Sequence, residues 1–144
     1  MTHTLFRFDE ELAVVRLEPG SDLPGWAVSG TLLSVTATAD ETSLVCAMGG
    51  VPRKARRAGP FTAFALKGPL DLGLTGVLSG LLAPLAEHQV PVFTVSTFDT
   101  DWLLVPAEHA DRATDAWREA GNQVRPADQP ADQPSDQASD GGSA

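Results

Sequence analysis

The sequence predicts an α+β fold of two related subdomains in tandem, each with an antiparallel sheet and the first with reduced helices. Short runs rich in β-branched residues recur along the chain, whereas segments with helical periodicity occur only in its second half. In addition, residues 35–45 and 95–105 share the pattern V-[ST]-[AT]-x-x-x-[DE]-x-x-L-V at an offset of 60 residues. A repeat of this length indicates two versions of one supersecondary unit.

The first half is predicted to consist mainly of strands. Residues 12–17 are rich in β-branched side chains and end before Pro19-Gly20, so we expect a strand there. Residues 32–38 and 43–48 are two further predicted strands, and the polar link between them has hairpin length, so they should pair antiparallel. Cys46, the sole cysteine, lies in this apolar context and is expected to be a buried thiol.

A basic segment follows these strands. Between residues 51 and 60 the chain carries Arg53, Lys54, Arg56 and Arg57. These cations could form a phosphate-binding patch, but no aromatic residue or glycine-rich cradle accompanies them. We therefore favour a solvated loop or a short helix for this segment.

The second half is predicted to run strand, helix, strand, strand, helix and short strand. Strands are expected at residues 61–66, 90–97, 102–105 and, at an edge of the sheet, 122–125. One amphipathic helix should begin near Leu74, and another should cover residues 108–120 and end at Gly121. This is the βαββαβ order of a ferredoxin-like fold, in which helices cover one face of an antiparallel sheet.

Composition argues against nucleic-acid and membrane partners. The 144-residue chain has a formal net charge of -9, so long-range electrostatics oppose binding to nucleic acids and to anionic membranes. Its longest apolar stretch, residues 72–86, is shorter than the roughly 20 residues that span a bilayer. The N-terminus lacks a basic region followed by an apolar one, so we expect no secretory signal and a cytoplasmic protein.

The length leaves room for one compact domain or for two small subdomains that share a core. We expect a degenerate subdomain at residues 1–60, a second subdomain at residues 61–125 and a disordered acidic tail at residues 126–144. The tail repeats Ala-Asp-Gln-Pro and has no apolar residue larger than Ala or Pro, a composition that cannot bury a core.

The sequence contains no signature of catalysis. Its histidines, His3, His88 and His109, are not at metal-ligand spacing with another His or Cys, and Cys46 has no identifiable partner base. No Walker loop, nucleophile elbow or dinucleotide fingerprint occurs. We therefore expect a protein that is not an enzyme and that holds neither a metal nor a cofactor.

A family resemblance is carried by residues 68–78 (GPLDLGLTGVL), 83–86 (APLA) and 92–105 (VFTVSTFDTDWLLV). Through them the chain resembles bacterial stand-alone ACT-domain proteins and is similar to the ACT modules of animal cytosolic arginine sensors and of aspartate kinases. The resemblance is strong over residues 61–125 and weaker over residues 12–60. It implies tandem ferredoxin-like subdomains of the ACT type and a regulatory role rather than a reaction.

The resemblance also implies a ligand site, because such modules pair side by side and bind amino acids at their interfaces. The candidate ligand-binding residues carried onto this chain are Asp71, Gly73, Leu74, Thr75, Gly76, Thr97, Phe98, Asp99 and Asp101. Backbone amides at the helix start, between Gly73 and Gly76, favour a carboxylate, and Asp99 and Asp101 suit a ligand ammonium. Alternatively, the glycines only permit a turn and the aspartates are solvated turn residues.

The expected function is therefore that of a small-molecule sensor, most simply for an amino acid, that acts as a homodimer. Sheet edges and a thinly covered sheet face in the first half need a partner. The alternative is a protein–protein interaction or dimerisation module without a metabolite ligand. Arginine as the ligand is not implied, because the arginine-sensing module has an acidic residue where this chain has Leu74.

Overall fold

The computed structural model describes residues 2–70 and 73–127 of the chain. Its strands and α-helices are, in order, β1 Thr4–Arg7, β2 Leu12–Leu17, β3 Ser34–Ala37, β4 Thr42–Ala47, β5 Arg56–Leu66, α1 Val77–Glu87, β6 Phe93–Ser96, β7 Asp101–Pro106, α2 Ala110–Glu119 and β8 Gln123–Pro126. Short 3₁₀ helices, η1 Met48–Gly50 and η2 Ala107–His109, follow β4 and β7. The predicted α+β class is confirmed.

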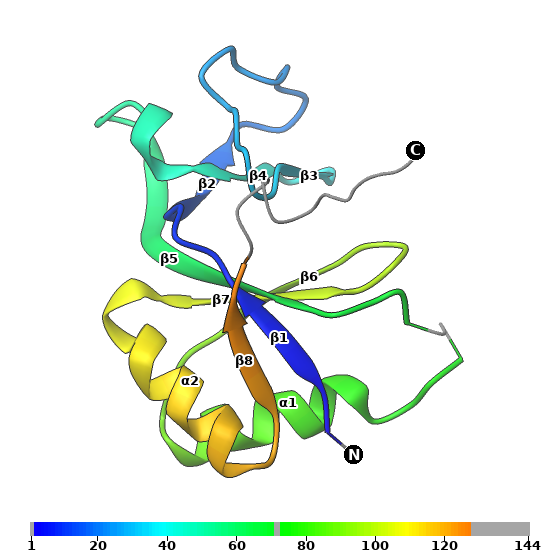
Figure 1. The fold of residues 1–144 in the computed structure, drawn as a ribbon. Helices are drawn as coiled ribbons and strands as arrows, with labels where there is room; N and C mark the ends of the chain where they lie inside the picture. Colours follow the sequence, from blue (N-terminus) through cyan, green and yellow to red (C-terminus); the bar gives the residue numbers. More distant parts are fainter. Residues whose placement is uncertain (1, 71–72, 128–144) are drawn as a thin grey trace, which may run out of the picture.

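The long strand β5 belongs to two sheets (Figure 1). Its first half pairs with β2, which continues to β4 and β3, and we call these strands the N-terminal sheet. Its second half lies between β1 and β7, and with β6 and β8 these strands form the C-terminal sheet. All pairs are antiparallel except β1 with β8. The predicted boundary between residues 60 and 61 therefore falls inside β5.

Strand β1 is an element that the sequence reasoning missed. It lies between β5 and β8, so residues 4–7, which the prediction placed in the first subdomain, complete the C-terminal sheet. Leu5 pairs with Leu66 and is fully buried in the same cluster as the helices. A strand of four residues is too short to show a periodic pattern, and its burial comes from tertiary packing.

The hairpins β3–β4 and β6–β7 confirm the duplication, but the predicted offset of 60 residues is wrong by one. Each element of the first hairpin, and the 3₁₀ helix that follows it, recurs 59 residues later. An offset of 60 would equate Val35 with Val95, yet Val35 pairs with Leu44 of one buried cluster and Val95 belongs to another. A one-residue slip exchanges the two faces of a strand, so the turn fixes the equivalence.

The reduced helices of the first half are also confirmed. The connection between β2 and β3, residues 18–33, contains no helix and is shorter than the connection between β5 and β6 by about the length of α1. Residues 51–55 likewise stand where the C-terminal half has α2. The first half is thus a ferredoxin-like unit that has lost both helices.

Buried apolar side chains form three layers. α1 and α2 cover one face of the C-terminal sheet around the fully buried Trp117 (Figure 1). The N-terminal sheet covers its other face, because Leu12 of β2 and Leu104 of β7 share a cluster. Loops close the remaining face, where Trp26 packs near Cys46. The predicted burial of Cys46 is confirmed, and this burial raises the pKa of its thiol.

The predicted acidic tail lies outside the described residues from Asp128 onward. Its first residue, Pro126, ends β8, and the Ala127 N–H donates to the Arg7 carbonyl oxygen at 2.7 Å. Among the residues that the structure describes, none of the helices is both long and apolar enough to cross a membrane.

Deleting residues 128–144 is expected to leave the melting temperature unchanged, because this segment has no apolar side chain larger than Ala or Pro to pack. Differential scanning calorimetry of the full and shortened chains checks this. A loss of several degrees would contradict it. A deletion that also removes Pro126 and Ala127 should lower the melting temperature, because β8 then loses its contacts with Arg7.

Candidate ligand site between α1 and the β6–β7 turn

The two segments predicted to hold the ligand lie against each other. The Leu70 N–H donates to the Asp99 carbonyl oxygen at 2.8 Å, and the Thr100 hydroxyl donates to the Leu66 carbonyl oxygen at 2.6 Å. The chain passes very close at Gly68, where an added Cβ would lie 2.9 Å from the Asp99 oxygen. These contacts fix the connection after β5 on the β6–β7 turn.

The turn itself is held by Thr97. Its N–H donates to the Thr100 carbonyl oxygen at 2.8 Å, and its hydroxyl both donates to that oxygen and accepts the Thr100 N–H. Thr38 makes the same set of contacts with Glu41 in the N-terminal half. The Thr97 hydroxyl, predicted as a ligand contact, therefore has a structural role in this turn.

A cavity of about 200 Å³ lies between the turn and the start of α1. It is lined by Leu70, Leu74, Val77, Ser96, Thr97, Asp99, Thr100 and Asp101. The segment before α1 and the helix supply an apolar wall, while the turn supplies hydroxyl groups and two carboxylates; no Lys or Arg is among the lining residues. The Ser96 hydroxyl donates to Asp101 Oδ1 at 2.7 Å and so orients that carboxylate.

The predicted residues at the helix start line a different cavity. Gly76 is the N-cap of α1 and has a φ of 79°, a left-handed conformation that favours glycine. Together with Thr75 it lines a space of about 120 Å³ that also contacts His3 and Asn122. Val77 lines both cavities.

The other predicted residues contribute less to either cavity. Phe98, at the tip of the turn, is 82% exposed and is not a lining residue. Gly73 is exposed, and Asp71 lies outside the described residues. Sequence reasoning did not single out Leu70, Val77, Ser96 and Thr100, although Ser96 and Thr100 lie within the predicted segment 96–101.

The N-terminal half does not repeat this site. Thr42 occupies the position of Asp101, and its hydroxyl is buried without a hydrogen-bond partner among the described residues. The Asp40 carbonyl oxygen, equivalent to that of Asp99, accepts a hydrogen bond from Arg16 at 3.0 Å instead of from a neighbouring loop. The carboxylate at this position is therefore specific to the C-terminal half.

A larger cavity of about 530 Å³ lies between α2, β1 and β8. Its lining arginines include Arg7, which pairs with Asp111 at 2.9 Å, and Arg118, which donates to the Val124 carbonyl oxygen. These guanidinium groups join α2 to the strands, so we assign them a structural role. In the described part of the chain, no cluster of three His, Cys, Asp or Glu side chains could hold a metal ion.

Replacing Gly68 by Ala is expected to destabilise the fold by about 1–3 kcal/mol, because its Cβ would press on the Asp99 backbone and displace the turn. Urea denaturation measures this change. Gly80→Ala is the matched control: it lies inside α1 with nothing within 4 Å of the new Cβ, so it should stabilise by about 0.5–1 kcal/mol. Equal effects of the two substitutions would contradict the close approach.

Comparison with known proteins agrees with this fold. Residues 59–119 match the family model of the ACT domain, and residues 10–54 match a model of an N-terminal domain. The arrangement of helices and sheets is the ferredoxin-like one, and the C-terminal part of the chain is an ACT domain.

The relatives place the chain among regulatory ACT-domain proteins. The bovine (Bos taurus) cytosolic arginine sensor for mTORC1 subunit 1 is 36% identical over 61 residues, which are 38% of this chain but only 18% of that protein. A structure from Agrobacterium tumefaciens is 29% identical, with a TM-score of 0.82 over 90% of this chain and 96% of that one. Clostridium acetobutylicum aspartate kinase shares the fold at 13% identity, with a TM-score of 0.59 over 78% of this chain and 33% of that chain.

Proposed function

We propose that this chain is a non-enzymatic regulatory protein that binds an amino acid in the cavity between α1 and the β6–β7 turn. The observation that carries this proposal is the composition of that cavity. Asp99 and Asp101 stand on one side of it, and the apolar side chains of Leu70 and Leu74 on the other. An ammonium group and an apolar side chain on one small molecule match these two walls.

Each end of such a ligand has a physical counterpart. Asp101, oriented by Ser96, accepts a charge-assisted hydrogen bond from the ammonium group. The positive end of the α1 dipole and the amides near Gly76 favour the carboxylate. Because Val77 lines both cavities, a ligand that extends past this side chain would contact both groups.

A thermal-shift screen against the proteinogenic amino acids tests this proposal. A ligand at 100 times its dissociation constant stabilises the folded state by about 2.7 kcal/mol, which is a measurable rise in melting temperature. If none of the amino acids raises the melting temperature, the chain is not an amino acid sensor. A dimer in the absence of any such shift would favour the alternative, an interaction module without a metabolite.

We also expect a homodimer that covers the exposed side chains near the site. Phe98, Leu74 and Phe93 are 82%, 47% and 37% exposed, and β6 is an unpaired edge of the C-terminal sheet in the described chain. Sedimentation equilibrium at micromolar concentration should give twice the monomer mass. Only monomer, with and without ligand, would contradict this prediction. Phe98→Ser should shift the equilibrium toward monomer, since it removes the most exposed of these side chains.

A further inference from the structure

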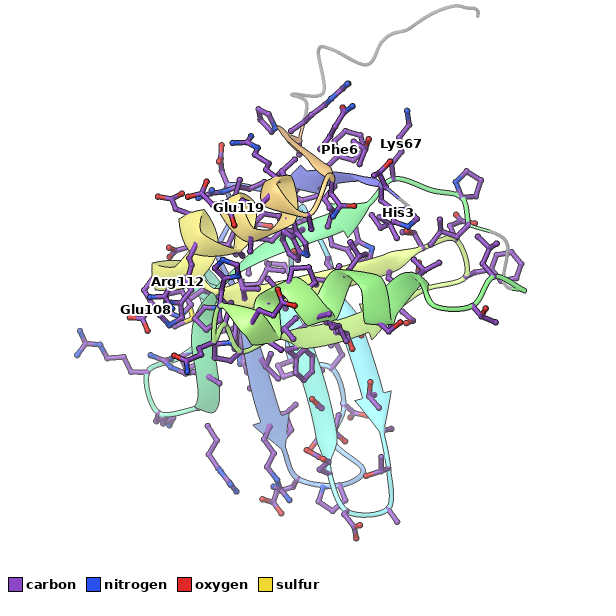
Figure 2. The ribbon with its side chains drawn as sticks, turned by 90° about the horizontal axis from the view of Figure 1, so that it is seen from below. His3, Phe6, Lys67, Glu108, Arg112 and Glu119 are labelled. Atoms are coloured by element: carbon purple, nitrogen blue, oxygen red, sulfur yellow. The ribbon has the colours of Figure 1, made fainter. Side chains whose placement is uncertain are left out.

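The N-terminal sheet carries a row of polar side chains across three strands. Arg16 of β2 lies directly opposite Arg56 of β5 on one side and opposite Ser43 of β4 on the other. Directly opposite residues of antiparallel strands share a face of the sheet. Figure 2 shows these strands extending past the C-terminal sheet, away from both helices. We call Arg56, Arg16 and Ser43 the arginine row.

The arginine row lines a cavity of about 480 Å³ on this sheet. The lining residues are Val14, Val15, Arg16, Glu41, Ser43, Arg56, Arg57 and Ala58. Glu41 is the only acidic residue among them, against three arginines. The cavity is therefore locally cationic in a chain whose formal net charge is -9.

The charges of the row are not balanced within the described chain. Like charges directly opposite each other on neighbouring strands repel. Arg16 is partly compensated, because it lies 3.5 Å from Glu18 and donates to the Asp40 carbonyl oxygen at 3.0 Å. Arg56 is exposed and has no ion pair in the described residues, where the Ser43 hydroxyl also has no hydrogen-bond partner. An anion between the two guanidinium groups would relieve the repulsion.

We propose that the arginine row binds the phosphate group of a small molecule. Two guanidinium groups and one hydroxyl present donors from three neighbouring strands, and a tetrahedral phosphate has separate oxygens for each of them. A carboxylate offers only two coplanar oxygens to the same donors. Arg16 is already held by Asp40 and Glu18, so little conformational freedom is lost when it binds.

This proposal replaces the expectation that the basic segment is only solvated. The sequence showed Arg53, Lys54, Arg56 and Arg57 without a second element to complete a site. The structure adds Arg16 and Ser43, which are distant in the sequence. Arg57 takes another part, since its guanidinium donates to the carbonyl oxygens of residues 51 and 52 and holds that loop.

Isothermal titration calorimetry of the full chain with inorganic phosphate and with pyrophosphate tests the proposal. We expect saturable binding of both that weakens as NaCl is raised. Arg16→Gln and Arg56→Gln should each reduce the affinity by roughly tenfold or more. Arg53→Gln is the matched control, because it removes the same charge from the same segment but does not line the cavity. Its affinity should stay within about twofold of the wild type.

Three results would overturn the site. The first is no saturable binding of either phosphate compound by the wild type. The second is an equal loss in all three variants, which would mean that only the net charge matters. The third is tighter binding of succinate than of pyrophosphate, which would show a carboxylate site instead. Urea denaturation of each variant ensures that the affinities compare equally folded proteins.

Discussion

Trp117→Ala is expected to destabilise the protein by about 3–5 kcal/mol, the largest effect that we foresee for a single substitution. Trp117 is fully buried where α2 meets the C-terminal sheet, and its indole packs edge-on to Phe64 with 4.8 Å between ring centroids. Its Nε1–H donates to the Leu81 carbonyl oxygen at 2.8 Å and so links α2 to α1. Guanidinium denaturation followed by circular dichroism measures the loss.

Two further variants make this result specific. Trp117→Phe keeps an aromatic ring beside Phe64 but loses the bond to Leu81, so it should cost less than Trp117→Ala. Leu23→Ala removes a side chain that is 50% exposed and should change the stability by no more than about 0.5 kcal/mol. A loss below about 1 kcal/mol for Trp117→Ala would show that the helices do not depend on this contact.

The C-terminal half was the easier part to predict because its elements announce themselves locally. The helix at α2 has a periodic apolar face and ends at Gly121, whose φ of 96° confirms the predicted stop. By contrast, β1 has only four residues, and its place between β5 and β8 depends on partners far along the chain. Local patterns carry no information about such an insertion.

The duplication shows a related limit of sequence patterns. The match between the two hairpins aligned hydrophobic letters and was one residue out of register. What the hairpins actually share is a four-residue turn that begins with Thr38 or Thr97, each of which bonds the end of its own turn. A hydroxyl that closes a turn is a weaker sequence signal than a run of valines, although it fixes the register.

The candidate site was predictable as two segments but not as a cavity. Segments 71–76 and 96–101 followed from the resemblance, and the structure joins their flanks through Leu70 and Asp99. The sequence could not show that Thr97 is used inside the turn or that Gly76 faces another space. Those facts depend on the path of the backbone after Gly68.

Asp101→Asn is expected to weaken binding of the responsive amino acid by roughly ten- to a hundredfold, the largest effect on binding that we foresee. The substitution keeps the shape of the side chain and leaves an oxygen that can still accept the Ser96 hydroxyl, which lies 2.7 Å from Asp101. It removes only the negative charge that faces the cavity, and hence the charge-assisted bond to the ligand ammonium. Calorimetric titration of the amino acid into both proteins measures the change.

Asp40→Asn provides the matched control, because Asp40 lies in the equivalent turn of the N-terminal half and makes the same loss of charge outside the cavity. Its affinity should stay within about twofold of the wild type, since an exposed charge at that distance is screened. Both variants should unfold at the same urea concentration as the wild type, because neither substitution changes a buried contact. Equal affinities of wild type and Asp101→Asn would place the ammonium elsewhere, and an equal loss in both variants would reduce the role of Asp101 to the general field of an acidic protein.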